Sequence, residues 1–161
     1  MKLRILLAYA AVVLALIPTV SFAQEKPFNL ALVTPIQIFS EETAISGMRI
    51  NLLYGRNTTV NGIDFGLVNH TTSGQSMGLQ WGGLNMTDAD FTGLQYGWVN
   101  ITKQNFKGMQ WGLVNYVNSG NGFMLGFVNY AMTMKGLQIG LINFIRQGGQ
   151  FPVFPIVNWS F

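Results

Sequence analysis

A few residues in this chain are of the types that enzymes and metal sites use. His70 is the single histidine, and Asp88 and Asp90 lie together in the polar connection 87–90. A histidine metal site needs further ligands, and the chain has no cysteine. The two carboxylates could touch a calcium ion, but they lack the spacing of a calcium-binding loop. We therefore interpret all three as exposed turn residues and expect no metal site, cofactor or catalytic residue.

Aromatic side chains form a second candidate site, because they recur at one spacing. The members of this column are Phe65, Trp81, Tyr96 and Trp111. If the column faced solvent, it could stack on sugar rings together with Trp98. We expect a buried column instead, because long exposed apolar strips are rare. The chain also shows no Ser-His-Asp set, catalytic carboxylate pair or phosphate-binding loop, so we do not expect an enzyme.

A repeat positions these residues. Six copies of a unit close to Gly-Leu-Gln-x-Gly-Leu-Val-Asn run from Gly62 to Asn143. Their first glycines are separated by 16, 15, 15, 14 and 14 residues. A fixed period indicates one small structural unit that is stacked many times.

Each copy reads as a β-strand followed by a turn. In the fourth copy Met109, Trp111 and Leu113 point one way and Gln110 points the other, which is the period of a strand. A glycine at every fourth position disfavours a helix. The polar residues between copies have turn composition. We therefore predict an all-β fold.

Two all-β architectures fit such strands. A barrel of antiparallel strands would repeat as a hairpin of roughly 30 residues, whereas the coils of a β-solenoid repeat every ~15 residues in one orientation. The apolar face of one copy covers about 13 Å, against about 25 Å for a lipid-facing barrel strand. The aromatic Phe161 on an alternating last segment favours the alternative, a small outer-membrane β-barrel. We expect a β-solenoid-like stack with capped ends.

Stacking predicts which residues become neighbours. The last residue of every copy would form a ladder of side-chain amides, and the third residue a file of glutamines in which Asp64 and Met124 are exceptions. Leu125 and Ile139 would continue the aromatic column. The ladder consists of Asn69, Asn85, Asn100, Asn115, Asn129 and Asn143.

The ends of the array differ from its middle. Residues 47–54 form a degenerate copy, and we expect 24–61 to be an N-terminal cap with this copy, 62–143 the six repeats and 144–161 the C-terminal cap. Pro155 replaces a repeat glycine, and Pro35 lies in the apolar stretch 28–39. Proline cannot donate to a sheet, so both belong on edge strands.

The N-terminal segment has the features of a secretory signal peptide. Lys2 and Arg4 precede an apolar run, and Ser21, Phe22 and Ala23 resemble a cleavage site. We expect 1–23 to be removed and 24–161 to be one domain. The chain has nine Lys and Arg against six Asp and Glu, and two of the basic residues leave with the signal, so the remainder carries seven basic and six acidic side chains. This balance does not indicate nucleic-acid binding.

The repeat and the closing Phe-Pro-Val-Phe-Pro-Ile-Val-Asn-Trp-Ser-Phe together resemble a family of bacterial cell-envelope surface repeat-containing proteins. The resemblance covers residues 47–161. It implies an envelope location without an established enzymatic activity, and it carries over no functional residues.

These features lead to one functional expectation and two alternatives. We expect a non-enzymatic, exported envelope or surface protein with a structural or interaction role, at the outer membrane or cell surface or else in the periplasm. Its partners would be the outer membrane or other envelope components. The alternatives are an integral outer-membrane barrel with a structural or pore role and a carbohydrate-binding solenoid that uses Trp81, Tyr96, Trp98 and Trp111.

Overall fold

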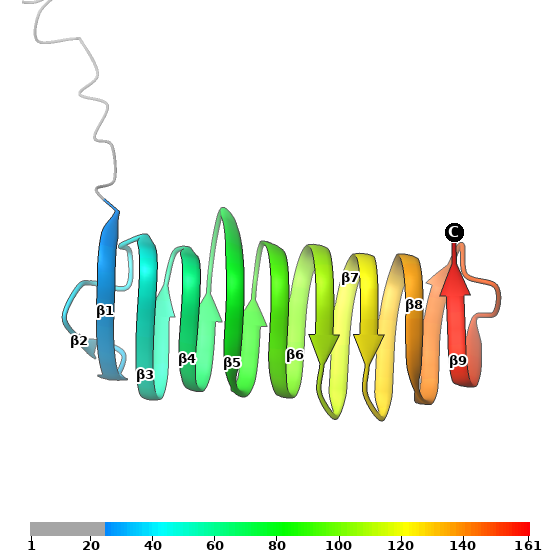
Figure 1. Cartoon of the computed structure of the whole chain (residues 1–161). Coiled ribbons are helices and arrows are strands. Elements are labelled where there is room, and N and C mark those ends of the chain that lie inside the picture. Colours follow the sequence, from blue (N-terminus) through cyan, green and yellow to red (C-terminus); the bar gives the residue numbers. More distant parts are fainter. Residues whose placement is uncertain (1–24) are drawn as a thin grey trace, which may run out of the picture.

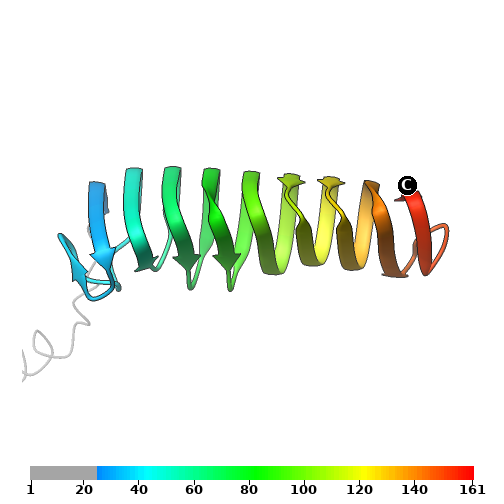
Figure 2. The same ribbon diagram turned by 90° about the horizontal axis from the view of Figure 1, so that it is seen from below.

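The computed structural model describes residues 25–161, and the expected signal segment 1–23 lies outside the described residues. Within that range the chain winds into a row of coils, with β2 and β1 at one end and β9 at the other (Figure 1). Figure 2 shows the same row from below. The strands are β1 (Lys26–Val33), β2 (Ile36–Gln37), β3 (Ile45–Asn57), β4 (Val60–Thr71), β5 (Gln75–Thr87), β6 (Asp90–Trp111), β7 (Val114–Leu125), β8 (Val128–Gln147) and β9 (Val153–Ser160).

Parallel pairing in register holds the coils together. Asn100 pairs with Asn85 on one side and with Asn115 on the other, both in parallel strands. The first glycines of successive copies are also paired, Gly62 with Gly78 and Gly78 with Gly93. The prediction of a β-solenoid is therefore confirmed, and the alternative of a barrel is wrong because barrel neighbours would be antiparallel.

The two ends of the stack are closed differently from its middle. At the N-terminal end β2 is the edge strand, antiparallel to β1. The expectation that Pro35 lies on an edge strand was wrong, because Pro35 is in the turn that joins these two strands. At the C-terminal end β9 carries Pro155 and is the other edge strand. β9 runs antiparallel to β8, because the turn at Gly148, where φ is +75°, reverses the chain instead of starting another coil.

The interior of the coils is partly polar, which reverses one expectation. The glutamine file is buried, and the side chains of Gln95 and Gln110 have no exposed surface. The aromatic column lies outside, where Trp81 and Trp111 are each 49% exposed. The expectation of a buried column was wrong because alternation shows which residues share a side of a strand and does not show which side faces inward.

The interior becomes more apolar toward β8. In the middle coils Thr102 donates to Oε1 of Gln95, and Gln110 donates to the same oxygen at 2.7 Å. In the following coils the positions of the threonine and glutamine hold Val117 and Met124. The apolar cluster consists of Phe91, Phe106, Val117, Met124, Ala131, Met134 and Ile145.

Candidate functional site

An asparagine ladder fixes the sharp bend of each coil. Nδ2 of Asn100 donates to Oδ1 of Asn115 at 2.9 Å and to the carbonyl of Trp111 at 3.1 Å. Its own Oδ1 accepts a hydrogen bond from Asn85 at 2.8 Å. Both amide protons and the oxygen are therefore used, and a carbonyl at the bend is satisfied away from water. The same amide-to-amide bond joins Asn69 to Asn85, Asn115 to Asn129 and Asn129 to Asn143.

The ladder also explains the second glycine of each copy. A Cβ on Gly97 would lie 2.2 Å from the carbonyl oxygen of Gly82 and 2.8 Å from Nδ2 of Asn85. No side chain fits at this position, because the neighbouring coil and its amide already occupy the space. We call these residues the glycine floor: Gly66, Gly82, Gly97, Gly112, Gly126 and Gly140.

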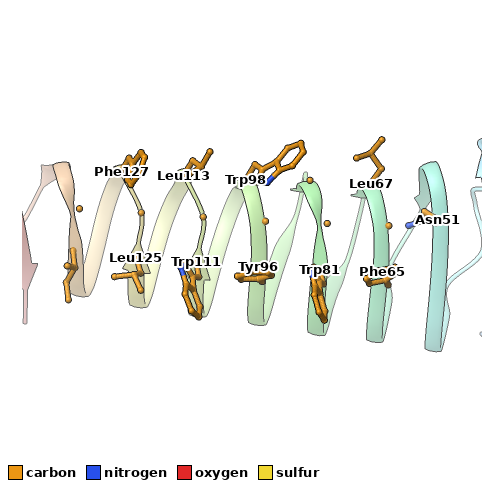
Figure 3. Close-up of a pocket in the computed structure, with 18 of the residues that line it drawn as sticks. Asn51, Phe65, Leu67, Trp81, Tyr96, Trp98, Trp111, Leu113, Leu125 and Phe127 are labelled. Carbon is orange, nitrogen blue, oxygen red and sulfur yellow. The ribbon is translucent and has the colours of Figure 1, made fainter.

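Two rows of apolar side chains rise on either side of the glycine floor (Figure 3). The aromatic row precedes the floor and consists of Phe65, Trp81, Tyr96, Trp111, Leu125 and Ile139. The corner row follows it and consists of Leu67, Gly83, Trp98, Leu113, Phe127 and Leu141. Together with the floor they line a groove of about 970 Å³ that runs along the stack. We call the two rows and the floor the apolar edge.

The aromatic rings contact one another edge to face. Trp81 and Tyr96 have centroids 5.7 Å apart with an interplanar angle of 82°, and Tyr96 and Trp111 are 5.3 Å apart at 79°. Phe65 meets Trp81 in the same way. This arrangement is favourable for aromatic pairs. It also turns successive ring faces through about a right angle, so the row does not present one flat platform.

Outward-facing apolar residues continue beyond the apolar edge onto both flat faces of the coils. On the face before the bend, Ile63 is 42% and Phe123 is 56% exposed. On the face after the bend, Val114 and Ile142 are also exposed. These positions are apolar in every copy, so the pattern is present in the sequence. It indicates an exposed apolar surface only because the glutamines and asparagines fill the interior.

The charged residues lie mostly in the connections between copies. Asp88, Asp90, Lys103, Lys107 and Lys135 all belong to these segments. We call this side of the stack the polar edge. Within the copies themselves, between the first glycine and the asparagine, Asp64 is the single charged residue, and it is buried.

Asp64 forms a buried ion pair that the sequence analysis missed. Its two oxygens accept hydrogen bonds from Nε and Nη2 of Arg49 at 2.8 and 2.7 Å, and Gln80 donates to it at 3.1 Å. Nη1 of Arg49 donates to the carbonyl of His70 at 3.0 Å, which helps to satisfy the buried guanidinium. The sequence pattern does indicate this ion pair, because Arg49 and Asp64 occupy the same repeat position, 15 residues apart.

His70 is a strand residue in a hydrogen-bonded chain rather than an exposed turn residue. Its Nδ1 lies 2.8 Å from the hydroxyl of Tyr54, and its Nε2 lies 2.9 Å from Oδ2 of Asp88. Lys103 pairs with the other oxygen of Asp88 at 2.8 Å. Burial raises the pKa of the Asp88 carboxyl, but the bonds from Lys103 and His70 outweigh burial and hold its pKa below the usual value.

The remaining candidate residues form no metal site in the part of the chain that the structure describes. Asp90 accepts hydrogen bonds from the backbone and side-chain amides of Asn105. Among residues 25–161 no group of three or more potential metal ligands occurs. In the same range, no helix has the length and apolar character needed to cross a membrane. Comparison of the chain with family models, curated proteins and solved structures gives no match.

Proposed function

We propose that this chain is a non-enzymatic repeat scaffold of a bacterial cell envelope, with a structural or interaction role, and that it attaches to an envelope component through its apolar edge. One observation carries the proposal. The polar groups that a β-protein normally turns toward water are bonded inside the coils, while the large apolar side chains of the repeat are displayed outside. An exposed apolar surface of this extent is typical of an interaction site.

A scaffold role is supported by how the ionisable side chains are used. Arg49 and Asp64 neutralise each other inside the stack, and His70 and Lys103 both bond to Asp88. These groups hold neighbouring coils together. We therefore assign them to stability rather than to catalysis.

The attachment site is the apolar edge rather than a sugar-binding strip. The exposure of Trp81, Tyr96 and Trp111 favours contact with a ligand, and Trp98 is 67% exposed in the adjacent row. Sugar rings, however, stack on flat aromatic faces and also need hydrogen-bonding groups beside them. The edge-to-face rings do not offer that platform, and the groove is lined almost entirely by apolar side chains and glycine.

The location in the envelope belongs to the same proposal. It is supported by the signal-like features of residues 1–23 and by the resemblance of the repeat to bacterial surface repeat proteins. We propose the outer membrane or cell surface as the place of attachment.

Fractionation of bacteria that express the full chain tests this function. We expect the chain in the envelope fraction, and we expect Trp98→Gln/Leu113→Gln/Phe127→Gln to move it to the soluble fraction. The matched control is Lys107→Gln/Lys135→Gln on the polar edge, which should leave the distribution unchanged. Circular dichroism of both purified variants verifies that the coils are intact. Recovery of the folded apolar-edge variant in the envelope to the same extent as the parent would refute the proposal.

A further inference from the structure

The apolar surface wraps around the bend of each coil on three sides. The corner row forms the tip, and it includes the most exposed large side chains of the repeats, Trp98 and Leu141. Phe123 is exposed on one flank and Val114 on the other. A folded protein partner with a flat surface would cover one of these sides and leave the others in water. A fluid apolar medium covers all three.

The backbone at the bend is already suited to such a medium. The amide of Leu113 donates to the carbonyl of Trp98 at 2.9 Å, and the amide of Phe127 donates to the carbonyl of Leu113 at 2.9 Å. Asn100 satisfies the carbonyl of Trp111 from inside. In hydrocarbon each unpaired backbone group is costly, so a segment can enter it only if these groups are paired within the protein.

The height of the apolar surface matches half a bilayer. From the tip at Trp98, the outward apolar side chains extend back to Leu94 and forward to Ile101, three to four residues in each direction. At about 3.3 Å per residue this is roughly 10–13 Å. The hydrocarbon of one leaflet is about 15 Å thick, half of the ~30 Å core. Beyond this height the polar edge begins, with Thr92 on one flank and Lys103 on the other.

We propose that the solenoid lies edge-on in one leaflet of a lipid bilayer, with its long axis in the plane of the membrane. The corner row points into the hydrocarbon. The tryptophan and tyrosine side chains of the aromatic row lie beside the corner row, and the polar edge stays at the level of the headgroups. This inference rests on the proposed function and names the partner of the apolar edge as lipid itself.

Labelling depth in vesicles tests the inference. The chain has no cysteine, so Leu113→Cys at the tip and Lys107→Cys on the polar edge each give one site for an environment-sensitive fluorophore. The vesicles contain phosphatidylethanolamine and phosphatidylglycerol, with nitroxide quenchers either in the headgroup or deep in the acyl chain. We expect the label at 113 to be quenched most by the deep nitroxide and the label at 107 most by the headgroup nitroxide. Equal depths, or no deep quenching of the label at 113, would overturn the inference.

A binding comparison separates this inference from the proposed function. We expect Trp98→Gln/Leu113→Gln/Phe127→Gln to bind the same vesicles roughly tenfold more weakly or worse, because three large apolar side chains no longer favour leaving water. Lys107→Arg, which keeps the positive charge beside the anionic headgroups, should bind like the parent. One outcome is that the parent fails to bind protein-free vesicles while its recovery in the envelope fraction still depends on the apolar edge. In that case the partner is a protein, and only the lipid inference is refuted. If fractionation does not depend on the apolar edge, the proposed function fails.

Discussion

Replacing one ladder asparagine in the middle of the stack should cost far more stability than an exposed asparagine would. Asn100→Ala removes the donor to the carbonyl of Trp111 and to Oδ1 of Asn115, two acceptors at the buried bend. A buried group left without its partner costs about 1–3 kcal/mol, so two of them give a loss of roughly 2–6 kcal/mol. Asn85 also loses an acceptor, but it still donates to the carbonyl of Tyr96.

Two further variants distinguish the effect of the lost hydrogen bonds on stability from the effect of the lost side-chain volume. Asn100→Asp keeps the volume and the acceptor but cannot donate from an ionised carboxylate, so we expect a loss at least as large as that of Asn100→Ala. Asn118→Ala is the matched control at an exposed position of β7 and should change the free energy of unfolding by less than about 0.5 kcal/mol. Urea unfolding followed by circular dichroism measures all three, and a true stability change lowers the midpoint without altering the slope. If both Asn100 variants lose no more free energy of unfolding than the control, the ladder is not a stabilising element.

Three other predictions concern the interior and the polar edge. Gly97→Ala places a Cβ against a carbonyl oxygen and should lower the urea midpoint clearly more than Gly83→Ala, whose Cβ has no contact shorter than 3.0 Å; equal midpoints would contradict the close approach. Met124→Gln completes the glutamine file and supplies a donor to an unpaired buried oxygen, so we expect a loss below about 1 kcal/mol, whereas Met134→Gln lacks such a partner and should lose about 2–4 kcal/mol in the same assay. The bonds from Lys103 and His70 hold the pKa of the Asp88 carboxyl below its ordinary value, so its stabilisation is present above the ordinary pKa and is lost as the pH falls through the lowered pKa; Asp88→Asn should flatten the acid limb of stability against pH, and an unchanged limb would argue against the ion pairs.

The architecture was predictable because the repeat keeps one phase. Glycines and asparagines separated by about 15 residues fall on the same position of successive coils, and Asn85, Asn100 and Asn115 are paired as that phase requires. Pro155 indicated an edge strand for a similarly local reason, since it has no amide proton to donate, whereas Pro35 lies in the turn before the edge strand β2.

The sidedness of the strands was not predictable by the same reasoning. A glutamine such as Gln95 is unfavourable inside a globular core, but here its amide meets an identical amide in the next coil, so burial leaves it satisfied. That outcome depends on the neighbouring coil and cannot be read from one strand. The groove also depends on contacts between neighbouring coils. The asparagine ladder at the bend excludes side chains from positions such as Gly97 and leaves Trp98 and Trp111 outside.

The reactivity of single cysteines on the two sides of the coil tests most directly that the interior is polar and the exterior apolar. The chain contains none, so Trp111→Cys and Thr102→Cys each introduce one thiol, the first on the exposed aromatic row and the second at a fully buried position. In the folded protein without lipid, we predict rapid modification of the cysteine at 111 by a water-soluble maleimide and modification of the cysteine at 102 only after unfolding in urea. Protection at 111 together with ready labelling at 102 would contradict an interior of polar ladders and an apolar exterior.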